Sequence, residues 1–331
     1  MIRERLYLFS SGSLRRQHNT LRFDAKNAKR PAFLPVEQIR EILVFGELEL
    51  NKRVLEFLSR KGVILHFFDR EGWYVGSYYP REHLNAGLVL VRQVMHYLDL
   101  NLRMYLARAF VEGAIRNMRQ VLLYYERRGV DVKEARQYLE HVDTSHAETP
   151  EQLMAVEGKA REIYWEAFAK ILGKSDLETG SRRRRPPSNE VNALVSFGNG
   201  LLYAMVLSEI FRTHLDPRIG YLHETNFRRF TLQLDVAEVF KPVLVDRTIF
   251  RLVNRKTIQK KHFKGIPGGI YLNGTGRKIF IQAWEETLRR TLHHPRLKRK
   301  VSYRRLLRLE LYKLEKHFVE GSEYRPFRLR G

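Results

Sequence analysis

The sequence predicts an α+β protein of two domains, a small β-rich domain over residues 1–85 and a larger, mostly α-helical domain over residues 86–331. Two patterns predict this class. Short runs rich in Val, Ile, Phe and Tyr occupy the chain as far as Pro80, and a 3.6-residue apolar period replaces them from Leu88 onward. A length of 331 residues with 44% hydrophobic composition is ample for buried cores in two domains.

Five segments of the first domain are expected to be strands, because each is a short β-branched or aromatic run bounded by turn-forming residues. They are RLYLF (5–9), TLRF (20–23), EILVFG (41–46), VILHFFD (63–69) and WYVGSYY (73–79). One helix is expected among them. LELNKRVLEFLSRKG (48–62) has helical spacing at Leu50, Val54, Leu55 and Leu58, and Gly62 stands in the position of a C-cap.

Helices are expected to fill the second domain to its end. The stretch 88–129 keeps the helical period over several turns. Two segments interrupt the pattern: SDLETGSRRRRPPSNE (175–190) is polar and Arg-rich with a Pro pair, and KKHFKGIPGGIYLNGTGRK (260–278) is basic and Gly-rich. Both are predicted to be mobile surface loops.

The net charge points to a polyanionic partner. The chain has 60 Lys and Arg against 37 Asp and Glu, a formal charge of +23 and a pI of about 10.2. Nucleic acid is the commonest partner of this kind, because each phosphate neutralised releases condensed counterions. An anionic membrane surface is the alternative, but it would normally be contacted through an amphipathic basic helix or a lipid anchor, and neither is evident.

The absence of cysteine limits the chemistry. It excludes disulfides, thiolate catalysis and zinc-finger sites, so any metal must be held by oxygen or imidazole. The N-terminal residues MIRERLYLFSSG are not a secretory signal, and no uninterrupted apolar run approaches membrane-spanning length, so a cytoplasmic location is expected.

Four acidic or imidazole side chains stand in unexpected places. Glu157 falls on a helical stripe that is otherwise apolar, and His223 follows two bulky apolar residues in a turn-rich segment. Asp235 and Glu238 lie three residues apart in LQLDVAEVF (232–240), on one face of a helix that Pro242 is expected to kink. The stripe is formed by Leu153, Ala160, Tyr164, Phe168 and Ile171.

Each of these residues also has a structural explanation. Glu157 can reach solvent from the margin of its stripe, a lone His is more often structural, and Asp235 suits the positive end of a helix dipole. The acid pair requires an arginine, open water or a divalent cation to offset its charge. If the four converge, carboxylates and one imidazole suit Mg²⁺ or Mn²⁺, and such a cation would hold a phosphate substrate in a basic protein.

Four motifs follow one another along the second domain: VEGKAREIYWEAF (156–168), RRRRPPSNEVNALVSFGNGLLY (182–203), LDPRIGYLHE (215–224) and LQLDVAEVFKPVLVDR (232–247). In this order they resemble the CRISPR-associated integrase family, the metal-dependent subunit of spacer acquisition. The first domain is similar over 54–82, and EYRPF (323–327) resembles the C-terminal end of the family, so the resemblance covers nearly the full chain.

The resemblance implies a homodimer in which each subunit has a β-sandwich-like N-terminal domain and an α-helical catalytic domain with one metal site. Carried over by motif, the Mg²⁺ or Mn²⁺ ligands are Glu157, His223 and Glu238, and Asp235 supports the site as a ligand or from behind it. The implied reaction is transesterification, in which the 3′-hydroxyl of spacer DNA attacks a phosphodiester at the edge of a CRISPR repeat.

The resemblance also implies partners. These are double-stranded DNA, both spacer precursor and CRISPR repeat, and a small ferredoxin-like CRISPR-associated companion subunit. Two basic runs are candidates for DNA phosphate contacts, with a solvated surface as the alternative. Their residues are Arg182, Arg183, Arg184, Arg185, Lys298, Arg299 and Lys300.

Two other functions share these features. A nuclease that repairs branched DNA would use the same site and release cleaved rather than joined product. A non-catalytic nucleic-acid scaffold would pair its acids with its plentiful arginines, and Glu157→Ala would then change no activity.

Overall fold

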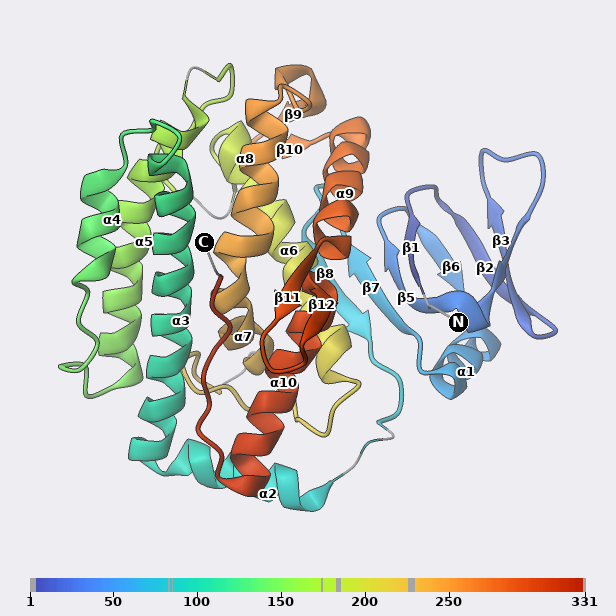
Figure 1. Ribbon diagram of the computed structural model, residues 1–331. Helices are drawn as coiled ribbons and strands as arrows, with labels where there is room; N and C mark the ends of the chain where they lie inside the picture. Colours follow the sequence, from blue (N-terminus) through green and yellow to red (C-terminus); the bar gives the residue numbers. More distant parts are fainter. Residues whose placement is uncertain are drawn as a thin grey trace.

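The computed structural model describes residues 4–82, 84, 86–173, 175–182, 186–225 and 230–329 (Figure 1). A strand-rich N-terminal part precedes a larger helical part, so the predicted α+β class is confirmed. Strand β8 ends at Tyr78 and helix α2 begins at Gly87. The predicted boundary at residue 85 lies in the segment between them.

The N-terminal part contains two four-stranded sheets, in the orders β1-β5-β7-β8 and β4-β3-β2-β6. Both contribute to one small core, which includes Leu14 and Leu21 from one sheet and Ile42 from the other. Leu43, the next residue along β5, belongs instead to the core of the helical part. This alternation along one strand lets the first sheet bury both faces. The strands are β1 Glu4–Leu8, β2 Gly12–Gln17, β3 Thr20–Ala25, β4 Ala32–Pro35, β5 Ile39–Val44, β6 Leu48–Leu50, β7 Ile64–Phe68 and β8 Tyr74–Tyr78.

All five predicted strands are present, as β1, β3, β5, β7 and β8. Strands β2, β4 and β6 were not predicted, because they are short or polar and are held by pairing with neighbouring strands. The predicted helix begins later than expected, since Leu48–Leu50 is strand β6. Helix α1, Lys52–Lys61, starts after the Asn51 cap and ends at Gly62, whose φ of 63° confirms the predicted C-cap.

The helical part is built around α6, which is buried along most of its length. In the described part of the chain, α6 is also the one helix long and apolar enough by composition to cross a membrane, and 83% of its apolar window is buried inside the protein. This finding does not contradict the sequence prediction, which concerned uninterrupted apolar runs, because Asn192, Ser196 and Asn199 interrupt the apolar residues of α6. The helices are α2 Gly87–Leu98, α3 Leu100–Glu126, α4 Lys133–Glu140, α5 Pro150–Leu172, α6 Glu190–Ile210, α7 Leu232–Phe240, α8 Arg247–Asn254, α9 Gly274–Arg289 and α10 Tyr303–Glu320.

Helices α7 and α8 are joined without a loop by a π-helical turn, Lys241–Asp246 (Figure 1). Pro242 lies in this turn, at the point where the sequence predicts a kink. Helix α3 packs along α7, and the Asn117 side chain of α3 donates a hydrogen bond to the Val239 carbonyl at 2.8 Å. The buried amide fixes the two helices against each other, which holds the acidic residues of α7 in place.

The prediction that residues 260–278 form a loop was wrong for most of that range. Strands β9 (Phe263–Ile266) and β10 (Gly269–Leu272) form a hairpin there, and Asn273 caps the start of α9. The described residues of 175–190 form no helix or strand before Glu190. A second hairpin, β11 (Thr291–His294) with β12 (Arg299–Ser302), lies between α9 and α10.

Candidate metal centre

A cleft of about 1770 Å³ lies between the two parts of the protein. Its walls come from β8, α5, α6 and α7, and from the loop that precedes α7. Glu157, His223 and Glu238, the three predicted metal ligands, all line it. These three residues, up to 81 positions apart in the sequence, therefore share one cavity.

Glu157 is presented to the cleft by α5. The predicted apolar stripe of this helix is buried from Leu153 to Ile171, which fixes the rotation of the helix and turns Glu157 to the edge of the stripe. Its side chain is only 16% exposed. Arg161, one turn further along α5, donates from Nε to Glu157 Oε1 at 2.5 Å.

Glu238 lies deeper, on α7, with a side chain that is 7% exposed. Arg161 donates to its Oε2 at 2.5 Å, and the Lys241 ammonium donates to its Oε1. Burial alone would raise the pKa of Glu238, but the positive charges of Lys241 and Arg161 outweigh burial and hold this pKa at about 2. Glu238 is therefore ionised, and two cations of the chain neutralise it.

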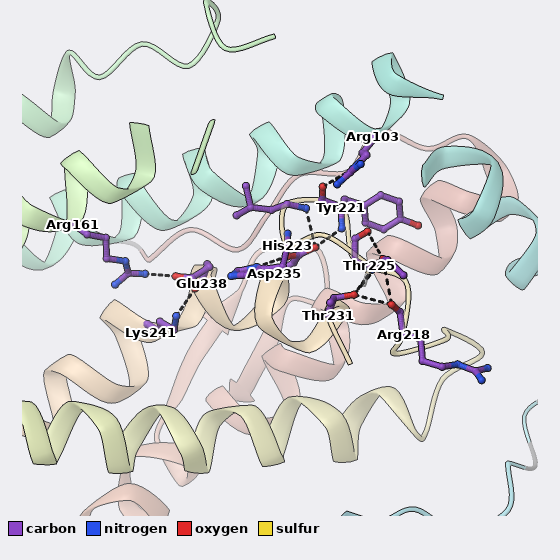
Figure 2. Close-up of polar contacts among 12 residues, drawn as sticks. Arg103, Arg161, Arg218, Tyr221, His223, Thr225, Thr231, Asp235, Glu238 and Lys241 are labelled. Carbon is purple, nitrogen blue, oxygen red and sulfur yellow. Dashed lines mark hydrogen bonds and ion pairs between the residues drawn. The ribbon is translucent and has the colours of Figure 1, made fainter. Parts of the chain in front are cut away.

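His223 is held by Asp235, as Figure 2 shows. Asp235 is completely buried, and its Oδ1 accepts from the His223 backbone N–H at 2.9 Å and contacts His223 Nδ1 at 2.7 Å. Its Oδ2 accepts the backbone N–H groups of Tyr221 and Leu222. This arrangement places the proton on Nδ1 and leaves Nε2 of His223 as the ring nitrogen available to a ligand.

The segment that carries His223 is braced from several sides. Gly220 donates its backbone N–H to Thr231 Oγ1 at 2.8 Å, and Arg103 of α3 donates to the Tyr221 carbonyl at 3.0 Å (Figure 2). A Cβ at position 220 would lie 2.8 Å from the Thr231 side chain, so only glycine permits this approach. The brace explains how a segment without regular secondary structure positions an imidazole.

The donor types fit a hard divalent cation, since two carboxylates and one imidazole are ligands that Mg²⁺ and Mn²⁺ accept. Glu157, His223 and Glu238 would hold the cation, whereas both Asp235 oxygens are occupied by the His223 segment. Within the described ranges, no three His, Asp or Glu side chains are close enough together to hold a metal ion. Arg161 lies between two of the three predicted ligands, because it donates to both Glu157 and Glu238. A cation would have to displace that guanidinium.

Three cleft residues were not predicted: Arg161, Lys241 and Asp246. For the first two a signal exists in the sequence, because a basic residue three or four positions after an acid on a helix is placed to pair with it. Asp246 had none. It lines the cleft from the π-helical turn, and its burial raises its pKa to about 6.

The predicted DNA contacts are divided between two places. Arg182 lines the cleft and donates to Asn192 of α6 at 2.8 Å, while Arg183, Arg184 and Arg185 lie outside the described residues. Lys298, Arg299 and Lys300 are exposed on the β11–β12 hairpin.

Known proteins resemble this chain over its full length. A family model described as CRISPR associated protein Cas1 matches residues 6–286. The CRISPR-associated endonuclease Cas1 2 of Thermodesulfovibrio yellowstonii is 49% identical over 328 residues, which cover 98% of this chain and 99% of that protein. A solved Cas1 protein from Thermotoga maritima has a TM-score of 0.88 and 44% identity, over 99% of this chain and 100% of that one.

Two more distant structures share the fold. A casposase bound to integration product matches with a TM-score of 0.84 at 19% identity, over 98% of this chain and 92% of that one. A chain of a Cas6-RT-Cas1–Cas2 complex matches with a TM-score of 0.86 at 18% identity, over 99% of this chain and 36% of that one. The family model and the close relatives confirm the resemblance carried by the four motifs, and the chain belongs to the Cas1 family of CRISPR-associated proteins.

Proposed function

We propose that this protein is a metal-dependent DNA endonuclease and integrase of CRISPR adaptation. The 3′-hydroxyl of spacer DNA attacks a phosphodiester at the edge of a CRISPR repeat. A new O–P bond forms and the bond to the repeat strand's 3′-oxygen breaks. The proton of the attacking hydroxyl is passed to solvent, and the released 3′-oxygen takes up a proton from solvent to become a hydroxyl. The observation that carries the proposal is the meeting of Glu157, His223 and Glu238 in one cleft, with His223 oriented by a buried Asp235.

The side chains of the cleft are proposed to have three roles: orienting His223, holding the cation and binding phosphate. Asp235 keeps His223 protonated at Nδ1, so that Nε2 faces a ligand. Mg²⁺ or Mn²⁺, held by Glu157, His223 and Glu238, would supply polarisation of a phosphoryl oxygen and offset the charge that develops there. Arg161 and Lys241, no longer needed by the carboxylates, would be left to bind phosphate oxygens at the same place.

The proposal includes partners. One proposed partner is double-stranded DNA, and the net charge of +23 supports it because cationic side chains bind phosphates. A small ferredoxin-like companion is implied by the family, and one chain of matching fold comes from a Cas1–Cas2 complex. A homodimer is proposed from the family as well, and the exposed apolar side chains of α2, among them Leu88, Val91 and Leu98, support further protein contacts because such rows rarely face water. The proposed compartment is the cytoplasm.

Strand transfer tests the proposal directly. A labelled short duplex is incubated with a supercoiled plasmid bearing a CRISPR repeat, the companion subunit, and Mn²⁺, Mg²⁺ or EDTA. We expect joined product with metal and none with EDTA. Glu157→Ala, His223→Ala and Glu238→Ala are each expected to abolish joining while DNA binding is retained, because binding depends on the basic surface.

Two further variants sharpen the test. Asp235→Asn is expected to reduce joining by about 10- to 100-fold and to raise the Mn²⁺ concentration needed for half-maximal joining, because Asp235 acts through His223. Glu162→Ala, on the exposed side of α5, is the matched control and is expected to join normally.

Each alternative has its own outcome. Cleavage without joining would replace the integrase with a nuclease acting at the same site. No metal-dependent reaction from a folded, DNA-binding protein would favour the scaffold, in which Arg161 and Lys241 are permanent partners of the cleft carboxylates.

A further inference from the structure

A second cavity, of about 420 Å³, lies on the helical part, where the ends of α3, α8 and α9 meet the start of α10. We call it the basic pocket, after the five arginines that line it together with three tyrosines. The arginines are Arg128, Arg247, Arg251, Arg255 and Arg290. None of the predicted ligands, and none of the predicted DNA contacts that the structure describes, lines it.

The charge of the basic pocket is largely uncompensated. Among the described residues, one carboxylate forms an ion pair with these arginines, Glu286, which lies 3.4 Å from Arg251 and is more than half exposed. Burial and the neighbouring charge of Arg290 lower the pKa of Arg251. Five guanidinium groups around one cavity repel one another, and an anion bound among them would relieve that repulsion.

The arginines are also held in position. The Arg128 guanidinium lies over the Tyr124 ring at 3.6 Å from its centroid, and Arg247 lies over the same ring at 6.0 Å. Arg247 donates to the Tyr303 hydroxyl at 3.2 Å. Stacked and hydrogen-bonded guanidinium groups lose less freedom when they bind an anion than free surface arginines do.

Two packed aromatic rings lie between the basic pocket and the metal cleft. Phe168 lines the cleft, Phe250 lines the pocket, and their ring centroids are 4.3 Å apart. The π-helical turn divides in the same way, since Val243 faces the pocket while Lys241 and Asp246 face the cleft. The two cavities therefore open on different sides of the α7–α8 run.

The position of the basic pocket favours nucleic acid as its ligand. Thr291 and Tyr303 line the pocket, and between them the chain forms the β11–β12 hairpin, which exposes Lys298, Arg299 and Lys300. Phosphates along one strand of DNA could be bound in succession by the hairpin and the pocket. Guanidinium forks bind phosphate oxygens in pairs, and the hydroxyls of Thr291 and Tyr124 add neutral donors.

We propose that the basic pocket binds the phosphodiester backbone of double-stranded DNA, as a contact surface separate from the metal cleft. The inference rests on the proposed function in taking DNA as the partner. It goes further in placing DNA on the side of α7 and α8 that faces away from the cleft.

Binding of a fluorescent 30-base-pair duplex, measured by anisotropy in EDTA, tests the inference without the metal reaction. The double variant Arg255→Gln/Arg290→Gln removes two exposed arginines of the pocket. Arg127→Gln/Arg289→Gln, at exposed positions next to Arg128 and Arg290 but outside the pocket, removes the same charge and serves as control. We expect the pocket variant to bind the duplex about tenfold or more weakly than the control. The plot of log binding constant against log salt concentration should become less steep by about 1.8, the value for two phosphate contacts.

Cross-linking locates the DNA independently, since the chain has no cysteine. The variant Asn254→Cys, changed in the pocket wall, is labelled with azidophenacyl bromide and irradiated with the duplex. Adducts are expected from Asn254→Cys and not from Glu134→Cys, changed at an exposed position of α4.

Four results would overturn the inference. Equal binding by the pocket and control variants, or no adduct at Asn254, rejects the pocket and leaves the proposed function in place. No duplex binding by the wild-type protein rejects both. If the pocket substitutions weaken binding of a fluorescent polyglutamate peptide but leave binding of the duplex unchanged, the pocket binds an acidic protein instead of DNA.

Discussion

Arg161 binds both Glu157 and Glu238 and so occupies the place between them that a cation would take. Arg161→Met keeps much of its volume and removes its charge. In EDTA we expect the free energy of unfolding to fall by about 3 kcal/mol, since two largely buried carboxylates lose a partner. Mn²⁺ is expected to raise the melting temperature of the variant more than that of the wild type.

The control for this prediction is Arg116→Met, which breaks the partly exposed pair with Glu112 and is expected to change stability by less than about 1 kcal/mol. If Mn²⁺ stabilises neither Arg161→Met nor the wild type, the carboxylates do not bind a cation and the metal assignment is wrong.

Asp246 gives a pH dependence of defined sign. Burial raises its pKa in the folded protein to about 6, above the value of about 3.9 for an exposed Asp. Between these values the folded state retains a proton that the unfolded chain releases, so this group lowers stability as pH rises from 4 to 6. Asp246→Asn removes the effect.

We expect Asp246→Asn and the wild type to be equally stable near pH 4. Above pH 6 the variant should be more stable by about 3 kcal/mol, from 1.36 kcal/mol for each tenfold change in proton affinity. Urea unfolding in EDTA at pH 4 and pH 7 measures the difference. A difference that stays constant or reverses with pH would show that Asp246 is ionised in the folded protein throughout this range.

At the scale of elements, the same Gly→Ala substitution is expected to have opposite effects on stability at two helical positions. A Cβ at Gly113 of α3 would lie 2.8 Å from the Pro326 side chain, whereas a Cβ at Gly158 of α5 would have no atom within 4 Å. Gly113→Ala should therefore cost about 1–3 kcal/mol by overpacking. Gly158→Ala should stabilise the protein by up to about 1 kcal/mol, because alanine favours a helix.

Chemical denaturation of both variants measures this prediction. The two substitutions are identical, so helix propensity cancels in the comparison and the difference between them reports packing alone. A neutral or stabilising Gly113→Ala would mean that α3 and the C-terminal segment separate at little cost.

Elements stabilised by contacts within their own sequence could be predicted from it, whereas elements stabilised by pairing with other segments could not. Helix α1 has its own cap at Asn51 and its own stop at Gly62, so its end was predictable. Strand β2 has the polar sequence GSLRRQ and exists because β3 and β6 pair with it, and no pattern within it reveals those partners. The β9–β10 hairpin was taken for a loop for the same reason.

The cleft follows the same rule. The positions of Glu157, His223 and Glu238 were marked by motif, and the burial of the α5 stripe confirms the rotation that turns Glu157 inward. Asp246 could not be foreseen, because its place depends on a π-helical turn whose extra residue is set by packing against other helices. Local spacing indicates the pairs Arg161–Glu157 and Lys241–Glu238, but the bridge from Arg161 to Glu238 depends on which side chains α5 and α7 bring together.

At the scale of the whole molecule, buried charges join the strand-rich part to the helical part. Glu209 of α6 is 1% exposed and is bound by Arg40 of β5 and by Arg308 of α10, the latter at 2.7 Å. Burial alone would raise the pKa of Glu209, but the charges of Arg40 and Arg308 outweigh it and lower that pKa. The junction thus depends on a carboxylate that is charged and fully enclosed.

Glu209→Gln tests whether this junction keeps the two parts together. Removing one member of a buried network leaves Arg40 and Arg308 without their counter-charge, so the free energy of unfolding is expected to fall by about 3–5 kcal/mol. Glu140→Gln, which weakens a partly exposed network with Arg119 and Arg136, should cost less than about 1 kcal/mol.

Hydrogen exchange distinguishes loss of the junction from general instability. In Glu209→Gln the amides of β5 and β7, which face the helical part, should exchange faster by a larger factor than those of α3, because the strand-rich part would open first. Equal acceleration in β5, β7 and α3 would show instead that the two parts unfold as one unit. The cleft between them would then keep its width whenever the protein is folded, and DNA would have to enter it without separation of its walls.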